Sequence, residues 1–383
     1  MMRAADSLCS RPRHIATIVP GLVGTPDARP GSDLPKRHSR DWRVVMSHSC
    51  TRWVTLWIGC WTLGAAAAAA AGAEPLRPVH TYSIVARDAA SGELGVAVQS
   101  HWFSVGSAVT WAEAGVGVVA TQSLVDPAYG PRGLALMASG MSAGQAVDAL
   151  VRADDGRDVR QVAMVDREGR VAVHTGAKCI ESAGHHRGDG YSVQANMMHN
   201  DAVVPAMAAA YESARGDLTE RLLVALEAAQ AAGGDIRGSQ SAALLVVKGQ
   251  SSGRPWADRV VELRVEDHPQ PLTELRRLLQ VHRAYEHMNR GDVAIEHGDL
   301  AAARAEYAEA ARLAPGIVEV VYWQAVTLAT AGSVDEALPL FRQVFSAEPI
   351  WVELTRRLLK PGIIPDTPEG HALVERIVSE AAP

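Results

Sequence analysis

The chain has 383 residues, more than one average domain, so its length indicates at least two domains. Hydrophobic residues make up 48% and charged residues 21%, a globular balance that excludes a largely disordered or fibrous chain. Residues 1–73 hold 9 Lys and Arg against 4 Asp and Glu, which leaves 28 and 39 for the rest, a net charge of −11. Because nucleic-acid binding depends on Lys and Arg that displace counterions, we expect no nucleic-acid partner.

Residues 46–73 have the order of features typical of a secretory signal peptide. Arg52 precedes an apolar run at 53–63, and an alanine-rich stretch then ends in Ala71-Gly72-Ala73. We therefore expect a periplasmic or secreted protein without stable membrane insertion, and the alternative is an uncut membrane tether. The first 45 residues show no periodic apolar pattern, so we expect either translation from Met46 or a disordered segment.

Short strands with turn residues between them are predicted from about residue 80 onward. The runs at 80–88 and 94–100 flank a Ser-Gly turn and predict a hairpin, and a third strand follows within 114–122. Apolar residues at three- and four-residue spacing predict a helix within 133–151. The later predicted elements are a hairpin at 161–176 that turns at Glu168-Gly169, a strand at 191–198, two helices within 201–232 that split near Gly216-Asp217 with Asp201 as a helix cap, and a strand at 241–247. This order is typical of antiparallel sheets stacked face to face with helices outside.

Several motifs in this region are similar to those of the family called domain of unknown function 1028. They include GELGVAVQSHWFSVGS, WAEAGVGVVATQ, AGHHRGDGYSVQANMM and GGDIRGSQSAALLVV, and the resemblance covers about residues 80–265. Members of this family resemble N-terminal-nucleophile (Ntn) hydrolases. The resemblance therefore implies an α+β fold, namely a four-layer α/β/β/α sandwich, and hydrolysis of an amide bond.

Thr81 is the position that matches the nucleophile of an Ntn hydrolase. In such enzymes the first residue of the first strand attacks the substrate, and its own free α-amine is the base. An α-amine has an ordinary pKa of about 7.7–8.0, so part of it can accept a proton at neutral pH. Cleavage after Ala73 would leave seven residues in front of Thr81, so the mechanism requires a second cut between His80 and Thr81. The alternative is that Thr81 is an ordinary β-branched strand residue.

Other candidate site residues are polar side chains on one side of the strand at 191–198 and at strand ends. Ser192, Gln194 and Asn196 share one side of that strand, which must line a wet cleft or form an internal hydrogen-bond network. Asn196 is the candidate oxyanion donor. Further catalytic candidates are Asp235, Arg237 and Ser241, and the binding candidates are Gln194, Ser100, His101, Thr121, Gln122, Tyr129 and Arg132. The alternative is that these are turn and cap residues that stabilise the corners of the sandwich.

The sequence pattern predicts neither a metal site nor a cofactor. The pair His185-His186 with Asp189 nearby lacks the spacing of a metal-binding framework, and no phosphate-binding glycine loop is present. Cys179 lies six residues before His185, which permits a thiol–imidazole pair, and an inert buried cysteine is the alternative. The other three cysteines lie within the first 73 residues, so we expect no disulfide within the exported chain.

The C-terminal part carries a 34-residue repeat. A linker and a capping helix at 266–283 precede it, and the residue pairs that differ by this period are Gly298 and Gly332, Ala303 and Ala337, Tyr307 and Phe341, and Pro315 and Pro349. The pattern resembles tetratricopeptide repeats, which implies an all-α module of two repeats and a cap at 284–360, followed by a tail at 361–383. This resemblance implies a surface for a protein or peptide partner. A packing or dimerisation module, which would make a homo-oligomer, is the alternative.

Taken together, these features predict an exported protein in which an Ntn-hydrolase-like domain acts on an amide-bearing molecule and the repeats bind a partner. Two alternatives come from different functional classes. One is a non-catalytic scaffold, and the other is a small-molecule-binding protein of the cell envelope.

Overall fold

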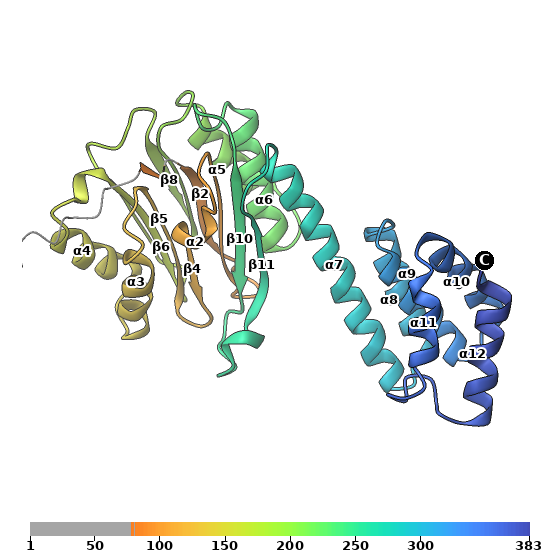
Figure 1. Cartoon of the computed structure of the whole chain (residues 1–383). Helices are drawn as coiled ribbons and strands as arrows, with labels where there is room; N and C mark the ends of the chain where they lie inside the picture. Colours follow the sequence, from red (N-terminus) through yellow and green to blue (C-terminus); the bar gives the residue numbers. More distant parts are fainter. Residues whose placement is uncertain (1–77, 80) are drawn as a thin grey trace, which may run out of the picture. The chain divides into compact units, whose positions relative to one another are not determined.

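Two antiparallel sheets form the first part of the structure, a computed structural model that describes residues 78–79 and 81–383 (Figure 1). The strands of sheet A are β1 (Pro78–Val79), β4 (Thr110–Glu113), β5 (Gly117–Leu124), β6 (Arg160–Asp166) and β7 (Val171–Thr175), in the order β1-β5-β6-β7 with β4 also on β5. The strands of sheet B are β2 (Thr81–Arg87), β3 (Leu94–Ser100), β8 (Gly184–Gly188), β9 (Tyr191–Ala195), β10 (Ser241–Val247) and β11 (Arg259–Val265), in the order β11-β10-β3-β2-β9-β8.

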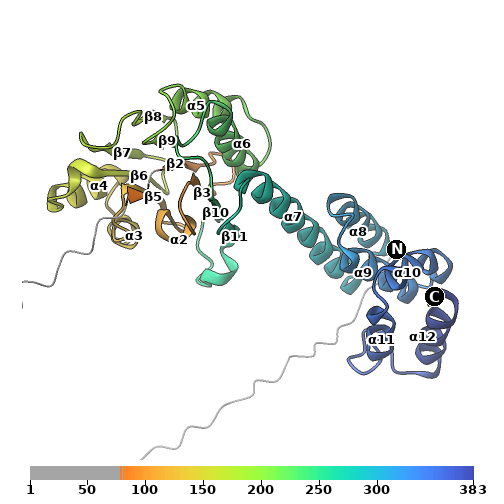
Figure 2. The ribbon, with the colours of Figure 1, turned by 45° about the horizontal axis from the view of Figure 1, so that its top comes forward.

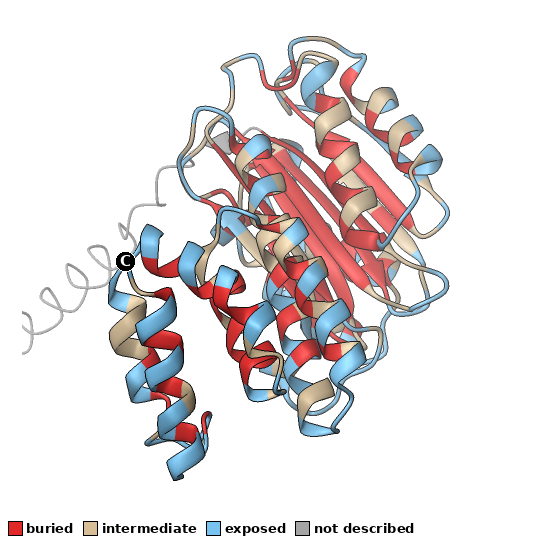
Figure 3. Cartoon of the chain, turned by 90° about the vertical axis from the view of Figure 1, so that its right-hand side faces the viewer, coloured by how far each residue is buried: buried red, intermediate tan, exposed pale blue. Residues whose placement is uncertain are grey.

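Helices cover the outer face of each sheet, as Figures 1 and 2 show. Sheet A packs against α3 (Tyr129–Ala138) and α4 (Ala143–Ala153), and sheet B packs against α5 (Val203–Ser213) and α6 (Leu218–Ala231). Val85, Val96 and Val118 belong to the apolar cluster between the two sheets. Alternating residues such as Ile84 contact the helical layer instead, because successive side chains of a strand point to opposite faces. The expected stack of antiparallel sheets with helices outside is therefore confirmed, and Figure 3 shows buried strands beneath partly exposed helices.

The predicted helix within 133–151 is wrong in one respect, because the structure has two helices there. Gly140 has a φ of +101°, a left-handed conformation that ends α3. Ser142 then caps α4: its hydroxyl accepts a hydrogen bond from Gln145 N, and the Gln145 side chain accepts one from Ser142 N. A short helix α2 (Gly106–Val109) and the strands β1, β4, β8 and β11 were not predicted.

The two helices within 201–232 are confirmed, but only one of their caps is. Asp217 accepts a hydrogen bond of 2.8 Å from Glu220 N and caps α6 as expected. The predicted cap at Asp201 is wrong, because Ala202 is the residue before α5 and no side chain caps that helix. The carboxamide oxygen of Asn200 instead accepts a hydrogen bond from Ala202 N.

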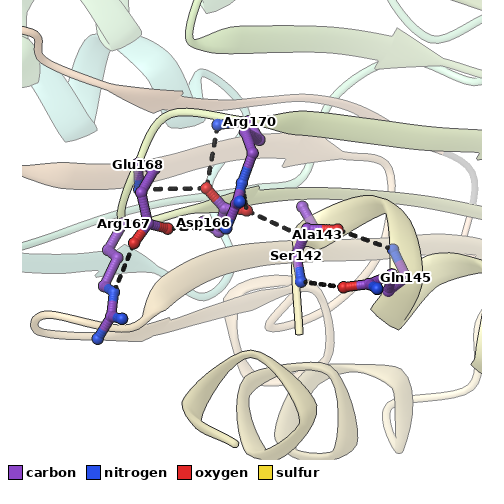
Figure 4. A network of polar contacts seen from close by, with 7 residues as sticks. All are labelled: Ser142, Ala143, Gln145, Asp166, Arg167, Glu168 and Arg170. Atoms are coloured by element: carbon purple, nitrogen blue, oxygen red, sulfur yellow. Dashed lines mark hydrogen bonds and ion pairs between the residues drawn. The ribbon is translucent and has the colours of Figure 1, made fainter. Parts of the chain in front are cut away.

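Asp166, at the end of β6, fixes the β6–β7 turn to the start of α4 (Figure 4). Its side chain is almost fully buried and accepts a hydrogen bond of 3.0 Å from Ala143 N. It also accepts bonds from the backbone nitrogens of Glu168 and Arg170 and from the Arg170 guanidinium. A single carboxylate therefore satisfies donors of the turn and of the helix N-terminus, where negative charge is favourable.

The C-terminal part consists of helices. They are α7 (Pro271–Glu296), α8 (Leu300–Leu313), α9 (Val318–Thr330), α10 (Val334–Ala347), α11 (Ile350–Arg357) and α12 (Pro368–Ala381). Helix α7 is continuous across the boundary predicted at 283, and its residues Leu272, Leu275 and Leu279 pack against sheet B and α6. The predicted tail at 361–383 contains α12, whose residues Val374 and Ile377 belong to the apolar core of the C-terminal helices.

The 34-residue period of the sequence is visible in the helix boundaries. Helices α8 and α10 each have 14 residues, and they begin 34 residues apart at Leu300 and Val334. Gly298 and Gly332, just before these helices, have φ of +75° and +86°. The paired residues Ala303 and Ala337, and Tyr307 and Phe341, are all buried. The first helices of the two 34-residue units therefore match, whereas the second helices differ, because α9 has 13 residues and α11 has 8.

The described part of the chain contains no helix that is both long and apolar enough to cross a membrane. The predictions about the signal peptide, about Met46 and about the first 45 residues lie outside the described residues.

Candidate functional site

A network of buried polar side chains lies between the two sheets, at the end where β2 and β6 begin and β5 and β7 end. Alternation along β2 directs Thr81 and Ser83 toward sheet A, in line with Val85 of the core between the sheets. Gln122 of β5 and Gln161 of β6 approach them from sheet A. Ser192, Gln194 and Asn196 approach from β9 and the residue after it, and all of these side chains are fully buried.

Gln122 connects the two sheets. Its Oε1 accepts a hydrogen bond of 2.6 Å from Ser83 Oγ in sheet B. Its Nε2 lies 2.7 Å from Gln161 Oε1, 3.2 Å from the carbonyl oxygen of Thr81 and 3.4 Å from that of Gln194. A buried amide in contact with this many partners holds its neighbours in one arrangement, because each broken bond would leave a desolvated polar atom.

Gln161 is the second branching point of the network. Its Oε1 also accepts a hydrogen bond of 2.9 Å from Asn196 Nδ2, and its Nε2 donates to Thr175 Oγ1 and to the carbonyl oxygens of Gly184 and Ala195. On the sheet B side, Gln194 Nε2 lies 2.5 Å from Ser83 Oγ, and Ser192 Oγ donates to Gln194 Oε1. Of the two possibilities predicted for the polar side of β9, the structure shows the internal network.

Thr81 lies at the edge of this network as the first residue of β2. It is fully buried, and its carbonyl oxygen accepts hydrogen bonds from Asn196 N at 3.1 Å and from Gln122 Nε2 at 3.2 Å. Pro78 and Val79 pair with Leu124 and Ser123 of β5, which belongs to the other sheet. The backbone therefore passes from sheet A to sheet B between Val79 and Thr81.

The network reaches the surface at Thr175 and His185. Thr175 Oγ1 lies 2.9 Å from His185 Nδ1 and accepts a hydrogen bond from Gln161, so its own proton is available to donate to the imidazole. Burial of the ring lowers the pKa of His185, and the charges of Arg187, His174 and His186 lower it further. Both observations favour the neutral imidazole with its proton on Nε2.

A polar pocket of about 490 Å³ opens beside Thr175. Its lining residues are Thr175, Gly176, Ala177, Cys179, Glu181, Ser182, Ala183 and Asp201. The loop that forms it is held against the chain after β9, because Met197 N donates to Ile180 O at 3.2 Å and Met198 N contacts Ser182 O at 3.4 Å. The pocket is thus next to Asn196 and to the outer end of the network.

The structure brings only some of the predicted site residues together. Thr81, Gln122, Gln194 and Asn196 share the network. Asp235 and Arg237 form an ion pair of 2.6 Å in the loop before β10, where Asp235 also accepts a hydrogen bond from His101 N. The side chain of Tyr82 faces the helical layer. Burial raises the pKa of Tyr82, and the negative charge of Asp235 raises it further. Asp235 also forms an isolated β-bridge with Met198, which packs in the apolar cluster beneath α5 and α6, so the Asp235–Arg237 pair lies near the helical side of sheet B, apart from the network.

The remaining candidates have local structural partners. Ser241 Oγ accepts a hydrogen bond from Val105 N and donates to the carbonyl oxygen of Trp102, so it fixes the start of α2. Thr121 Oγ1 donates to Asp126 O, on the helical side of sheet A. Tyr129 donates to Asp154, and burial together with this bond raises the pKa of Tyr129. Ser100 is the buried strand partner of Thr81 and of Ser241, whereas His101 and Arg132 are exposed.

Cys179 and His185 do not form the thiol–imidazole pair that the spacing permits. The thiol contacts the carbonyl oxygen of Arg160 at 3.4 Å, and the imidazole contacts Thr175. Burial raises the pKa of the Cys179 thiol, and the nearby Ser123 hydroxyl partly offsets this rise. A thiol with a raised pKa is a poor nucleophile at neutral pH. Within residues 81–383, His, Cys, Asp and Glu side chains form no group of three or more that could hold a metal ion.

Sequence reasoning missed three members of the network, Ser83, Gln161 and Thr175. The signal for Gln161 was present, because a glutamine at the start of the apolar run QVAMV alternates with Ala163 and Val165 on the side that faces the core. Ser83 likewise alternates with Val85. Ser83 meets Gln194 across the neighbouring strands β2 and β9 of sheet B, whereas Gln161 meets Asn196 across the two sheets, and no single strand encodes either contact.

Comparisons with known proteins give a match for this part of the chain. The model of the family of unknown function DUF1028 matches residues 81–275, so the matched segment begins at Thr81. The crystal structure of protein SPO2555 from Silicibacter pomeroyi, which carries the same family model, is similar with 31% identity and a TM-score of 0.48. That similarity covers 52% of this chain and 85% of the other. No curated protein matches the chain.

Proposed function

The chain belongs to the DUF1028 family of unknown function, and we propose that its family domain is an Ntn-type hydrolase that cleaves amide bonds with Thr81 as the nucleophile. The observation that carries this proposal is the position of Thr81. It is the first residue of a buried strand, its side chain faces the space between the sheets, and two amide donors hold its carbonyl oxygen. The family match and the stack of helices, two sheets and helices also support it.

The proposal requires cleavage of the peptide bond between residues 80 and 81. This cut turns the nitrogen of Thr81 into a free α-amine, with an ordinary pKa of about 7.7–8.0. The amine accepts the proton of the Thr81 hydroxyl while Oγ1 attacks the substrate carbonyl, and it then donates that proton to the leaving nitrogen. Water hydrolyses the resulting ester on Thr81 and releases the acid. The pairing of β1 with β5 places the residues before the cut on the other sheet, where they can remain or be displaced.

We assign to Asn196 the role of oxyanion donor. Asn196 N donates to the carbonyl oxygen of Thr81, and the Asn196 carboxamide belongs to the same network through Gln161 and Gln122. Its Nδ2 donates to Gln161 Oε1 at 2.9 Å, which fixes the direction of the amide. A preorganised amide donor of this kind is worth about 10²–10³-fold in kcat.

A β-lactone probe tests the nucleophile directly, because a reactive hydroxyl opens the lactone and forms a stable ester. We expect the protein that begins at Thr81 to gain one adduct, located on Thr81 by peptide mass mapping. Thr81→Ser should still be labelled, and Thr81→Ala should not. Ser83→Ala is the matched control, because Ser83 lies two residues along the same strand face but has no free amine. Labelling of Ser83, or equal labelling of the Thr81→Ala variant, would overturn the proposal.

The internal hydrogen bonds of the network favour a second candidate function, a binding protein without turnover. Thr81 is fully buried and the glutamines contact one another, which is also expected of a structural network. If this candidate is right, Thr81→Ala leaves every activity of the protein unchanged, and ligands stabilise the fold without being consumed.

We further propose that the helices α8–α11 form two tetratricopeptide-like repeats that bind a protein or peptide, and that the protein is exported. The equal lengths and 34-residue offset of α8 and α10 support the repeat assignment. The order of charge, apolar run and small residues at 46–73 supports export. Cell fractionation tests export, and loss of a co-purified partner after removal of residues 300–383 tests the repeats.

A further inference from the structure

Strand β1 occupies one end of an edge of β5. Strand β6 pairs with β5 from Gly117 to Ser123, so β1 and β4 must share the opposite edge, because a strand has two edges. On that edge β4 extends as far as Ala120, and the two residues of β1 pair with Ser123 and Leu124. This end of β5 is therefore a place where a short extended segment of chain binds through its backbone.

The two residue pairs between β1 and β5 have different roles. Paired residues of an antiparallel ladder alternate between a pair that exchanges two N–H···O bonds and a pair that exchanges none. Pro78 has no N–H, so its pair with Leu124 is the one without these bonds, and the bonded pair is Val79 with Ser123. This edge of β5 therefore requires an N–H at the place of Val79 but not at the place of Pro78.

A ligand in the place of β1 lies beside the proposed nucleophile. Val79 and Thr81 are two residues apart in the chain, so their Cα atoms lie within about 7 Å of each other. Before the cut, the carbonyl carbon of residue 80 is bonded to Thr81 N. During turnover, the acyl carbon of the substrate is bonded to Thr81 Oγ1. These two Thr81 atoms are attached to adjacent carbons and lie less than about 4 Å apart. The acyl side of a substrate therefore has a short path from Thr81 to the edge of β5.

We propose that the edge of β5 at Ser123 and Leu124 is the subsite for the acyl side of the substrate, and that the substrate is a peptide. Its residues before the cleaved bond are extended and pair with β5 as Pro78 and Val79 do. Strand β1 fills this subsite in the uncut chain, and its release after the cut opens the subsite. The inference rests on the proposed function for cleavage of the bound peptide, but the pairing of a peptide with β5 can be measured without turnover.

Calorimetric titration of the full chain with a short peptide tests the subsite. The variant Val79→Pro removes the N–H of the bonded pair and so weakens the hold of β1 on the edge, whereas Pro78→Ala keeps that pair and is the matched control. The probe is acetyl-Leu-Arg-Ala-Val-amide, which has the sequence of residues 76–79 with alanine at position 78. We expect it to bind Val79→Pro at least about tenfold more tightly than the wild type or Pro78→Ala, in which β1 competes intramolecularly. Equal binding to all three chains, or no binding to Val79→Pro, would overturn the inference.

Two N-methylated forms of the probe locate the backbone contact. Methylation of the valine nitrogen removes the N–H that pairs with Ser123, so it should weaken binding to Val79→Pro about tenfold. Methylation of the alanine nitrogen should leave binding unchanged, because proline at position 78 has no N–H either. Hydrogen exchange gives the position on the protein: the probe should slow exchange of the Ser123 amide but not of the amides of β10. Equal effects of the two methyl groups, or protection away from β5, would reject this subsite.

Protection of Thr81 separates this inference from the proposed function. In the protein that begins at Thr81, the probe at ten times its Kd should slow β-lactone labelling of Thr81 about tenfold, as competition for one place requires. Peptide binding at β5 together with failed labelling of Thr81 would reject the hydrolase and keep the peptide site. Labelling of Thr81 at the same rate with and without the bound probe would keep the hydrolase and reject the subsite.

Discussion

Each buried glutamine between the sheets acts as donor and acceptor at once. Gln122 and Gln161 together contact atoms from β2, β7, β8 and β9, so two amides of sheet A organise one end of the sandwich. An apolar side chain of similar size could fill the same volume, but it would leave the partner groups without hydrogen bonds. A buried polar group lowers the stability of the fold mainly when it lacks a hydrogen-bond partner.

Replacing Gln161 with Leu should lower the free energy of unfolding by about 2–4 kcal/mol, because Asn196 Nδ2 and two backbone carbonyls lose a buried partner. Urea denaturation measures this change. Gln145→Leu is the matched control: Gln145 is exposed and contributes to one helix cap, so its replacement should cost less than about 1 kcal/mol. Equal costs for the two variants would show that the network contributes little to stability.

His185 should titrate below its ordinary pKa of 6.5, because burial of the ring and the nearby charges of Arg187, His174 and His186 disfavour the imidazolium. The unfolded chain therefore takes up this proton at a higher pH than the folded chain. As the pH falls from about 6.5 toward the pKa of folded His185, the contribution of this residue makes the fold less stable. NMR titration of the ring resonances measures the pKa, and Arg187→Gln should raise it. A value at or above 6.5 would contradict the described environment.

At the residue scale, the sequence could predict which side of a strand a polar residue occupies, but not its partner. The shared side of Ser192, Gln194 and Asn196 follows from strand alternation and is confirmed. The contact of Asn196 with Gln161 depends on how two separate sheets stack, and it joins residues more than 30 positions apart. The same limit applies to Asp235 and Arg237, whose neighbouring positions predicted a pair but not the side of the sheet on which it lies.

At the element scale, the locations of strands and hairpins were the most predictable features. The β2–β3 and β6–β7 hairpins are confirmed because alternating apolar residues flank tight turns, with Gly169 in the left-handed region at +82°. Strand β8, with the sequence GHHRG, lacks apolar alternation and forms only because it pairs with β9 at the sheet edge. Helix α12 was not predicted for another reason. Its core residues contact α10, and the local sequence pattern could not indicate this contact.

The turns before α8 and α10 provide a prediction at this scale. Gly298→Ala and Gly332→Ala should each lower the free energy of unfolding by about 1–2 kcal/mol, because both glycines have a positive φ. Gly316→Ala is the control, since its φ lies outside the left-handed region and all three sites have open space for a Cβ. That variant should be neutral or slightly stabilising. Thermal unfolding measures all three, and a cost at Gly316 equal to the others would contradict the turn assignment.

For the molecule as a whole, the main finding is that Thr81 begins sheet B while the two described residues nearest before it belong to sheet A. The amide network holds the carbonyl side of Thr81, and the pairing of β1 holds the chain on its amino side. A cut between residues 80 and 81 would therefore create an amine at a fixed position between two stable sheets. In the proposed mechanism, the folded sandwich positions Thr81 as the nucleophile, and the cut would make it reactive.

The length of the mature chain tests this account most directly. Intact mass and N-terminal sequencing of the protein purified from its native cells should give a chain that begins at Thr81, and the Thr81→Ala variant shows whether the cut itself depends on the threonine. The measured mass should equal that of a chain whose first residue is Thr81. A mature protein that keeps Glu74 to His80 and still hydrolyses an amide would contradict it.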